Sequence, residues 1–260
     1  MLSDAQIAHY HDQGYVFPDY RLPADVLEAI RADHDRLLAR FPQHPEFRDN
    51  CPALLNYDFG FLDYARNPDI LDMVEQLIGP DIALWNMSFF AKPAFNGKRT
   101  PWHQDGDYWP IRPLATCTVW IAVDDATREN GCMRFLPGSH RRKQVRPHVT
   151  RNDPALTLQQ ELVADEVDEE AAVDVELEAG QISLHDVYLA HGSAENRSDR
   201  PRRGMTLRLM PTTSLYDREE AARMQAARGG RSLAHHSLLL MRGVDRHGGN
   251  DFRVRSAARD

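Results

Sequence analysis

The chain has 260 residues, of which 42% are hydrophobic and 27% are charged, and its formal net charge is −8. This composition is typical of a globular protein, and the length suits one large domain or two small ones, each with a sizeable core. The negative charge argues against a nucleic-acid partner. We interpret the basic cluster at 140–148 and the acidic run at 161–180 as solvated surface.

The cysteines and the N-terminal segment bear on the cellular compartment. Cys51, Cys117 and Cys132 are odd in number and far apart in sequence, which argues against both a disulfide framework and a zinc knuckle. The first 15 residues are amphipathic and acidic and do not resemble a signal peptide. No apolar stretch reaches the length needed to span a membrane. We therefore expect a cytoplasmic protein without a membrane partner.

The N-terminal part of the chain reads as helical. Ser3 is a suitable N-cap and Gly14 a suitable terminator for a first helix, and apolar residues at helical spacing predict a second helix over 24–40. A third helix is expected to begin at the Asn67–Pro68 pair and to end at Gly79.

The residue pattern changes after residue 80 from helical spacing to short apolar runs. Short runs rich in β-branched and aromatic residues, separated by Gly, Pro and Asn turns, predict strands within 82–95, 116–125, 132–140, 171–186 and 204–214. Such runs favour an antiparallel sandwich or barrel. We expect one domain over 1–260, mostly β, with helices in about 1–80 packed against the β core. Residues 216–241 return to a helical composition, and "RGGRS" within them is interpreted as a loop or mobile lid.

Most of the twelve histidines can be assigned to the surface or to turns. The surface set is His9, His11, His34, His44 and His247. His140 closes a "PGSH" turn. His235 and His236 are adjacent, so they cannot both point into one site on a regular element. We take His103, His185 and His191 as the candidates for a site.

The segment "TPWHQDGDYWPI" at 100–111 places His103 and Asp105 two residues apart. On a strand these two side chains share a face, whereas Gln104 turns away and Gly106 lets the chain bend. Asp107 is therefore expected at the rim. An imidazole and a carboxylate on one face can bind a divalent ion, but a surface ion pair is the alternative.

A second imidazole would make the metal site specific. If a strand that carries His191 lies beside the His103 strand, two histidines and one carboxylate form a facial triad. Such a triad leaves positions open for substrate and O2 at ferrous iron, and second-shell hydrogen bonds must fix the imidazole tautomers. The same ligands could hold zinc with an open water position.

Arg202 opens a predicted strand a short loop after His191. A guanidinium pairs bidentately with a carboxylate and stays protonated, so it suits the far end of a dicarboxylate that chelates the metal. The adjacent Arg203 would point to the opposite side of the strand.

Taken together, "WHQD", "TVWIAVDDATRENGCMRFLPGSH" and "HGSAENRSDRPRR" resemble the phytanoyl-CoA dioxygenase-like (PhyH) family of Fe(II)/2-oxoglutarate-dependent oxygenases. The resemblance implies a double-stranded β-helix (jelly roll, cupin-like) with flanking helices. It assigns Fe(II) to His103, Asp105 and His191. It further implies that 2-oxoglutarate binds Arg202, supported by Ser193, in a pocket lined by Lys92 and Trp120, and that Asn196 fixes a loop.

The substrate pocket is less strongly indicated. Its candidate residues are Tyr57, Asn86, Tyr108, Trp109, Arg112 and His185. The aromatic members could instead fill the core, and His185 faces the site only if its strand continues unbroken to His191. Arg112 could pair with a carboxylate or phosphonate of the substrate.

The expected activity is hydroxylation of an unactivated C–H bond in a small polar metabolite or natural-product intermediate, with release of succinate and CO2. The carboxylate of Asp105 argues against halogenation, because halogenating relatives have a small residue there. Desaturation, epimerisation and cyclisation stay open. A zinc hydrolase and a non-catalytic jelly-roll binding protein are further alternatives, and either would leave Arg202 unexplained. We expect a monomer or a small homo-oligomer.

Overall fold

The computed structural model describes residues 1–228 and 233–254. The α-helices are α1 (Asp4–Gln13), α2 (Ala24–Arg40), α3 (Leu62–Ala65), α4 (Pro68–Ile78) and α5 (Arg218–Arg228). The short 3-10 helices are η1 (Pro45–Arg48), η2 (Leu54–Asn56), η3 (Phe59–Phe61), η4 (Asp105–Tyr108), η5 (Ala164–Glu166), η6 (Glu169–Ala171) and η7 (Leu233–His235).

The strands follow the β-rich part of the sequence. They are β1 (Tyr15–Val16), β2 (Asn50–Cys51), β3 (Ile82–Lys92), β4 (Thr100–His103), β5 (Ile111–Arg112), β6 (Cys117–Ala122), β7 (Met133–Phe135), β8 (His148–Thr150), β9 (Gln160–Leu162), β10 (Val173–Val175), β11 (Ile182–Asp186), β12 (His191–Ser193), β13 (Arg202–Pro211), β14 (Leu215–Tyr216) and β15 (Leu239–Arg242).

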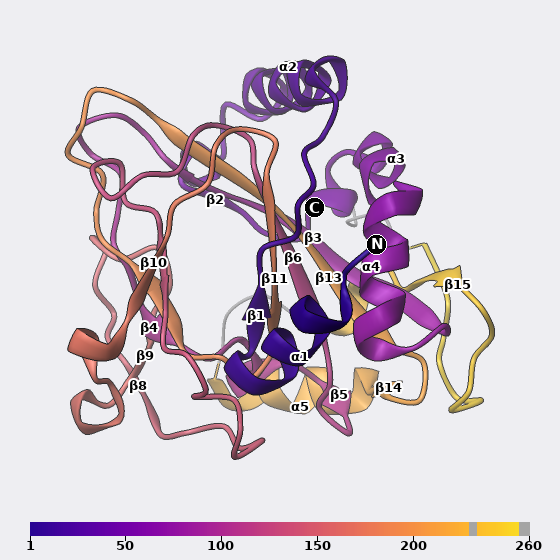
Figure 1. Ribbon diagram of the computed structural model, residues 1–260. Helices are drawn as coiled ribbons and strands as arrows, with labels where there is room; N and C mark the ends of the chain where they lie inside the picture. The colour runs from indigo at the N-terminus through magenta and orange to yellow at the C-terminus, as the bar shows by residue number, and fades with distance from the viewer. Residues whose placement is uncertain (229–232, 255–260) are drawn as a thin grey trace.

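Two antiparallel sheets face each other across the interior (Figure 1). The larger sheet has the order β1-β11-β6-β13-β3-β15, with β2 also paired to β3, and the smaller sheet has the order β10-β7-β12-β4. Sequence-distant strands are neighbours in both sheets, as a jelly roll requires. The predicted fold, a double-stranded β-helix flanked by helices, is confirmed.

The larger sheet is apolar outside and polar inside. On β13, Met205, Leu207 and Leu209 join the hydrophobic cluster that also contains residues of α2 and α4. The alternate residues of the same strand include Arg202 and Arg208, which line the interior. Because side chains alternate along a strand, one sheet can bury a hydrophobic core on its outer face and keep polar groups on its inner face.

The predicted helix boundaries of the N-terminal region are confirmed. Ser3 caps α1, and its side chain and that of Gln6 complete a capping box. Gly14 ends α1 with a φ of 90°, a left-handed conformation that suits glycine. Asn67 accepts a hydrogen bond from the backbone of Ile70, and Pro68 opens α4.

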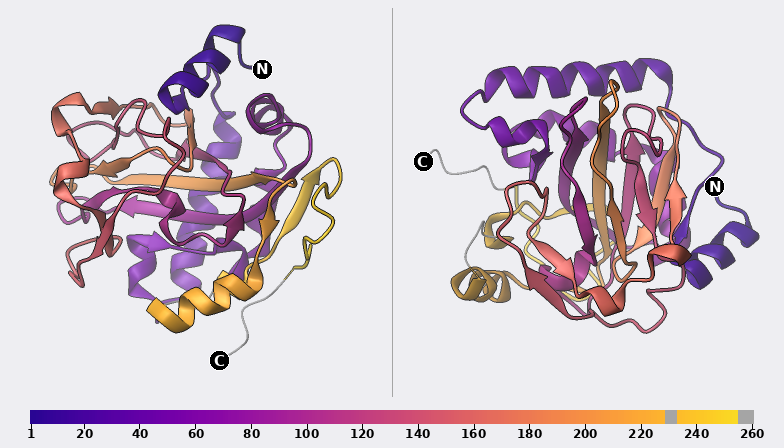
Figure 2. Two further views of the ribbon diagram at one scale, coloured as in Figure 1. Left: turned by 90° about the horizontal axis from the view of Figure 1, so that it is seen from below. Right: turned by 90° about the vertical axis from the view of Figure 1, so that its left-hand side faces the viewer.

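The helices lie on different sides of the β core. In Figure 1 and in the right-hand view of Figure 2, α2 lies at one end of the strands and α5 at the opposite end. Ala221, Met224 and Gln225 of α5 line a cavity that reaches into the barrel. No helix in the described ranges is long and apolar enough to cross a membrane.

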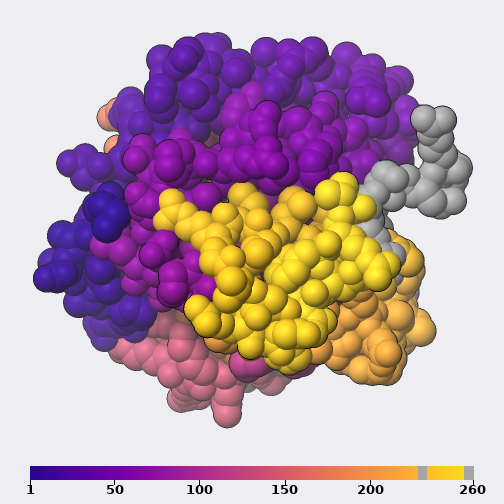
Figure 3. Space-filling model, turned by 90° about the vertical axis from the view of Figure 1, so that its right-hand side faces the viewer, coloured from indigo at the N-terminus to yellow at the C-terminus, as the bar shows by residue number. Residues whose placement is uncertain are grey.

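The C-terminal segment adjoins the helical region on one face of the molecule (Figure 3). Strand β15 pairs with β3, and Arg242 forms ion pairs with Asp72 and Glu75 of α4 at 2.5 and 2.7 Å. The helical composition predicted for 216–241 corresponds to α5 and η7. The "RGGRS" loop, interpreted as a lid, falls almost entirely on residues 229–232, outside the described residues.

The prediction that His34 lies on the surface is wrong. His34 lies in α2 with its side chain buried, and its ring packs at a tilt against that of Phe89, with 4.1 Å between the centroids. Neither ring nitrogen has a hydrogen-bond partner among the described residues. Burial and the charge of Arg203 lower the pKa of His34 from 6.5 to about 4. The imidazole is therefore neutral at pH 7.

This burial predicts a loss of stability in mild acid. The pKa of His34 is lower in the folded state than in the unfolded state, so the unfolded chain binds the proton first as the pH falls below 6.5. Between pH 7 and pH 5, we expect His34 to lower the free energy of unfolding by about 2 kcal/mol. A His34→Leu variant should lack this contribution in urea titrations at the two pH values. An unchanged difference between pH 7 and pH 5 would contradict this account.

Candidate metal centre

His103 and His191 are brought together by the pairing of two short strands. His103 is the last residue of β4, His191 is the first residue of β12, and the two are direct partners in the antiparallel register. Asp105 follows two residues later at the start of η4. All three are buried, and one ligand atom from each lies within 4.8 Å of the others. The structure thus assembles the predicted triad.

Backbone carbonyls orient both imidazoles. His103 Nδ1 lies 2.8 Å from the carbonyl oxygen of Pro101, and His191 Nδ1 lies 2.9 Å from that of Leu189. A carbonyl can only accept, so each Nδ1 carries the proton and each Nε2 presents a lone pair. Burial and the neighbouring His103 lower the pKa of His191 well below 6.5. Neutral imidazole is the form that binds a metal.

Asp105 is ionised in this buried setting. Burial alone would raise its pKa, but the Arg208 guanidinium and the rings of His103 and His185 outweigh that effect and hold the pKa well below 3.8. His103 Nε2 lies 3.7 Å from one carboxylate oxygen, and His185 Nε2 lies 3.6 Å from the other. A carboxylate and two imidazoles converging on one point fit a divalent metal ion.

Gln104 and Asp107, which flank Asp105 in the sequence, point away from the triad or lie outside it. Gln104 turns away from the centre: its side chain donates to the carbonyl of Tyr188 at 2.6 Å and accepts from the amide of Arg146 at 2.7 Å. The bond with Arg146 links Gln104 to the segment that follows the "PGSH" turn, and the bond with Tyr188 links it to the loop before β12. Asp107 is half-buried, 3.6 Å from His148.

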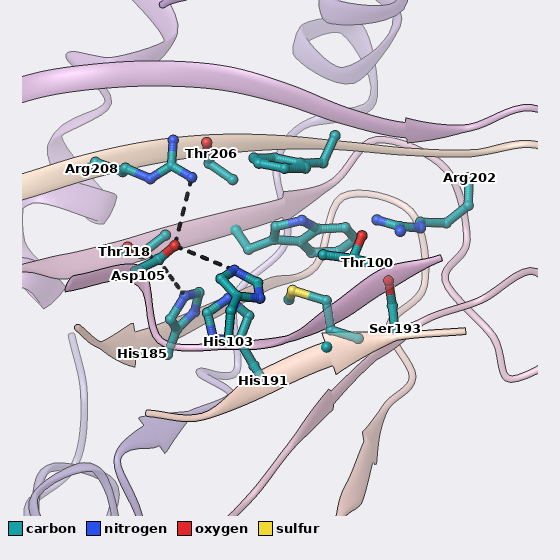
Figure 4. A pocket seen from close by; sticks show the side chains of 14 residues that line it. Thr100, His103, Asp105, Thr118, His185, His191, Ser193, Arg202, Thr206 and Arg208 are labelled. Atoms are coloured by element: carbon teal, nitrogen blue, oxygen red, sulfur yellow. Dashed lines mark hydrogen bonds and ion pairs between the residues drawn. The ribbon is translucent and has the colours of Figure 1, made fainter. Parts of the chain in front are cut away.

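Arg202 and Ser193 lie on one side of the imidazole cluster (Figure 4). Together with Trp120 they line a small cavity of about 40 Å³ that also contains the triad. Arg202 is 2% exposed and lies 5.4 Å from the centre of the Trp120 ring, and its Nε has no hydrogen-bond partner among the described residues. Burial lowers its pKa to about 10, so it remains a cation at neutral pH.

Gly204 makes this arrangement possible. It lies between Arg202 and Thr206 on the inward face of β13, and a Cβ at this position would be 2.1 Å from the Trp120 ring. The absence of a side chain at Gly204 lets the indole of Trp120 approach the strand closely beside the guanidinium.

Lys92 and Asn196 lie near the start of β13, where Arg202 is the first residue. Lys92 pairs with Arg202 in the β3–β13 register and is buried, but its amine donates to the carbonyl of Lys98 and does not line the small cavity. Asn196 donates to the carbonyls of Lys92, Pro93 and Arg200. It holds the loop before β13, which is the role the resemblance implied.

A second cavity of about 470 Å³ opens on the other side of the centre. Asn86, Tyr108 and Trp109 line it, as predicted for substrate residues, and Trp85 and Ser88 join them. His185 lies in the small cavity beside Asp105, so it faces the centre. Neither of its ring nitrogens has a hydrogen-bond partner among the described residues.

Two predicted substrate residues lie elsewhere. Tyr57 packs edge-on against Phe41 and Phe47, with ring centroids 5.4 and 4.7 Å apart. Arg112 is exposed and donates to the carbonyls of Trp109 and Ile111. Neither lines the two cavities, so the structure gives no support to their role in binding a substrate.

Arg208 is the residue that the sequence analysis missed. It lines both cavities, and its Nη2 lies 4.0 Å from Asp105 Oδ1. The available signal was strand periodicity, because Arg208 is six residues after Arg202 on one predicted strand and must share its face.

Comparisons with known proteins identify the family of the chain. Residues 10–204 match the family model described as phytanoyl-CoA dioxygenase (PhyH). A probable phytanoyl-CoA dioxygenase of Caenorhabditis elegans is 29% identical over 225 residues, which are 76% of this chain and 72% of the relative. The peroxisomal phytanoyl-CoA dioxygenase of Homo sapiens is 33% identical over 141 residues, 52% of this chain, but the match covers only 41% of that protein.

Solved structures of the same fold include non-heme enzymes. The apo form of the non-heme monooxygenase ThoJ is similar with a TM-score of 0.75 and 28% identity, over 97% of this chain and 89% of that one. The epimerase SnoN, solved with Fe3+, alpha-ketoglutarate and nogalamycin RO, has a TM-score of 0.67 and 23% identity, over 88% and 91% of the two chains. The chain belongs to the phytanoyl-CoA dioxygenase (PhyH) family of Fe(II)/2-oxoglutarate-dependent oxygenases.

Proposed function

We propose that this protein is a non-haem Fe(II)/2-oxoglutarate-dependent dioxygenase that hydroxylates an unactivated C–H bond of a small polar metabolite or natural-product intermediate. His103, Asp105 and His191 would hold the iron, and Arg202 would hold the 2-oxoglutarate. The observation that carries the proposal is a buried triad with two free Nε2 lone pairs, opposite a buried arginine that lacks a partner for its Nε.

Each group has a defined task in this proposal. Iron held by the triad would supply, with 2-oxoglutarate and O2, the oxidising power for C–H cleavage, with succinate and CO2 as co-products. The protein's own residues position the reactants: the Pro101 and Leu189 carbonyls fix the imidazoles, and Trp120 and Ser193 flank the arginine that would bind the distal carboxylate. Most side chains that line the inner cavity are buried, which limits access of bulk water.

A zinc hydrolase would use the same three ligands but has no need of Arg202. The buried arginine therefore favours the dicarboxylate co-substrate. Hydroxylation is the proposed outcome, although the family fold also hosts an epimerase. The three cysteines are free and buried, which suits a reducing compartment. We extend the proposal to a cytoplasmic location and to a monomer or small homo-oligomer.

Metal binding tests the triad directly. Asp105→Ala should weaken Co(II) or Mn(II) binding by about 100-fold or more, since it removes the charged ligand. Asp107→Asn is the matched control, because this carboxylate lies outside the triad and should bind metal like the parent protein. Calorimetric titration under anaerobic conditions gives both affinities. Equal losses in the two variants would show that the triad is not the metal site.

Uncoupled turnover tests the reaction class. With Fe(II), 2-oxoglutarate and O2 but no substrate, the protein should release succinate slowly, and His191→Ala should not. The measurement is succinate by chromatography, with product analysis on a metabolite panel to identify the outcome. A protein that binds Fe(II) or Mn(II) but never binds 2-oxoglutarate contradicts the proposal.

The co-substrate site is tested at Arg202. Arg202→Gln should weaken 2-oxoglutarate binding to the Mn(II)-loaded protein by roughly 30-fold or more, because a charge-assisted hydrogen-bond pair is lost. Metal affinity should be retained. Arg200→Gln, at an exposed position, is the control and should leave 2-oxoglutarate affinity unchanged. The assignment fails if Arg202→Gln binds 2-oxoglutarate as tightly as the parent protein.

A further inference from the structure

Arg208 lies at the boundary between the metal cavity and the larger cavity. Both cavities include it and Phe90 in their linings. Its side chain is only 6% exposed. In Figure 4 it lies on the opposite side of the imidazole cluster from Arg202, although both arginines project from the same face of β13.

The guanidinium has more donors than partners. Nη1 donates to Ser88 Oγ at 2.9 Å, and Nε has no hydrogen-bond partner among the described residues. The contact of Nη2 with Asp105 is 4.0 Å, too long for a hydrogen bond. A guanidinium offers five N–H donors, and leaving buried donors unmet is costly. The side chain is therefore placed to bind an additional acceptor.

The surroundings favour an anionic acceptor. The other polar side chains that line the larger cavity are amides, hydroxyls and a single imidazole, and no carboxylate is found in this lining within the described ranges. A divalent metal, Asp105, 2-oxoglutarate, Arg202 and Arg208 together carry a net charge of about +1. A singly charged anion beside Arg208 would neutralise the filled site.

The guanidinium also contacts two aromatic rings. Its central carbon lies 5.2 Å from the centre of the Trp109 ring and 5.5 Å from that of Phe90. A guanidinium that contacts aromatic faces can still bind a carboxylate through two parallel hydrogen bonds from its in-plane N–H groups, and the Nε of Arg208 has no partner among the described residues. Trp85 and Tyr108 provide apolar walls further into the cavity.

We propose that Arg208 anchors the primary substrate and that the substrate is a small carboxylate whose apolar part lies in the larger cavity. This inference rests on the proposed function. The sequence analysis suggested that Arg112 pairs with an anionic group of the substrate, and we now propose this role for Arg208 in the interior. The competing interpretation is that Arg208 serves only to position and neutralise Asp105.

The test uses benzoate as the anionic probe and benzamide as its neutral counterpart. The protein is loaded with Mn(II) and saturated with N-oxalylglycine, a 2-oxoglutarate analogue that occupies Arg202. Mn(II) accelerates the proton relaxation of molecules held close to it, so the measurement reports binding near the centre. We expect saturable enhancement for benzoate and at least tenfold weaker binding for benzamide.

Variants separate the two interpretations. Arg208→Gln should weaken benzoate binding at least tenfold, with Mn(II) and N-oxalylglycine binding retained, and Arg112→Gln should behave like the parent protein. Arg208→Lys, which keeps the charge near Asp105 but lacks the planar fork, should also bind Mn(II) normally and benzoate weakly.

Three results would overturn the inference: equal binding of benzoate and benzamide, parent-like benzoate binding by Arg208→Gln, or loss of Mn(II) affinity in Arg208→Gln. The loss of Mn(II) affinity would show that Arg208 serves to position and neutralise Asp105 and does not bind the substrate. Failure of the parent protein to bind N-oxalylglycine would instead contradict the proposed function, and this inference with it.

Discussion

The charged carboxylate of Asp105 is buried inside the barrel, and the surrounding interior is arranged around it. A buried charge is expensive unless it is paired, and here it lies between two imidazoles and the guanidinium of Arg208. These contacts are 3.6 to 4.0 Å long, looser than direct hydrogen bonds. A bound cation would pair directly with this buried carboxylate.

The jelly roll provides such an interior because its larger sheet has two different faces. Leu207 and its outward neighbours pack against α2 and α4, and this packing stabilises a strand whose inward residues are charged. The smaller sheet contributes the paired histidines from β4 and β12. One strand, β13, carries both interior arginines, so the two flank the metal centre along a single direction (Figure 4). In the proposed function, the Arg202 side would take the co-substrate and the Arg208 side the substrate.

Local signals in the sequence predicted the capped helices, the principal strands and the triad, because caps, alternation and ligand spacing act over a few residues. Features that depend on packing between distant segments were harder to predict. His34 follows Ile30 by four residues and precedes Leu37 by three, so helical periodicity indicated its buried face, but its polarity obscured this. Tyr57 and Arg112 were placed near the site by sequence order, and only the path of the loops shows that they lie outside the cavities. Arg208 could have been predicted by extending the side-chain alternation of β13 from Arg202, because the two residues share a face of the strand.

A crystal structure of the protein soaked anaerobically with Fe(II) and 2-oxoglutarate tests the central claim most directly. The account predicts iron bonded to Nε2 of His103, Nε2 of His191 and the carboxylate of Asp105, with the distal carboxylate of 2-oxoglutarate on Arg202 and the Arg208 side left open. Iron bound elsewhere, or 2-oxoglutarate held by Arg208, would contradict it.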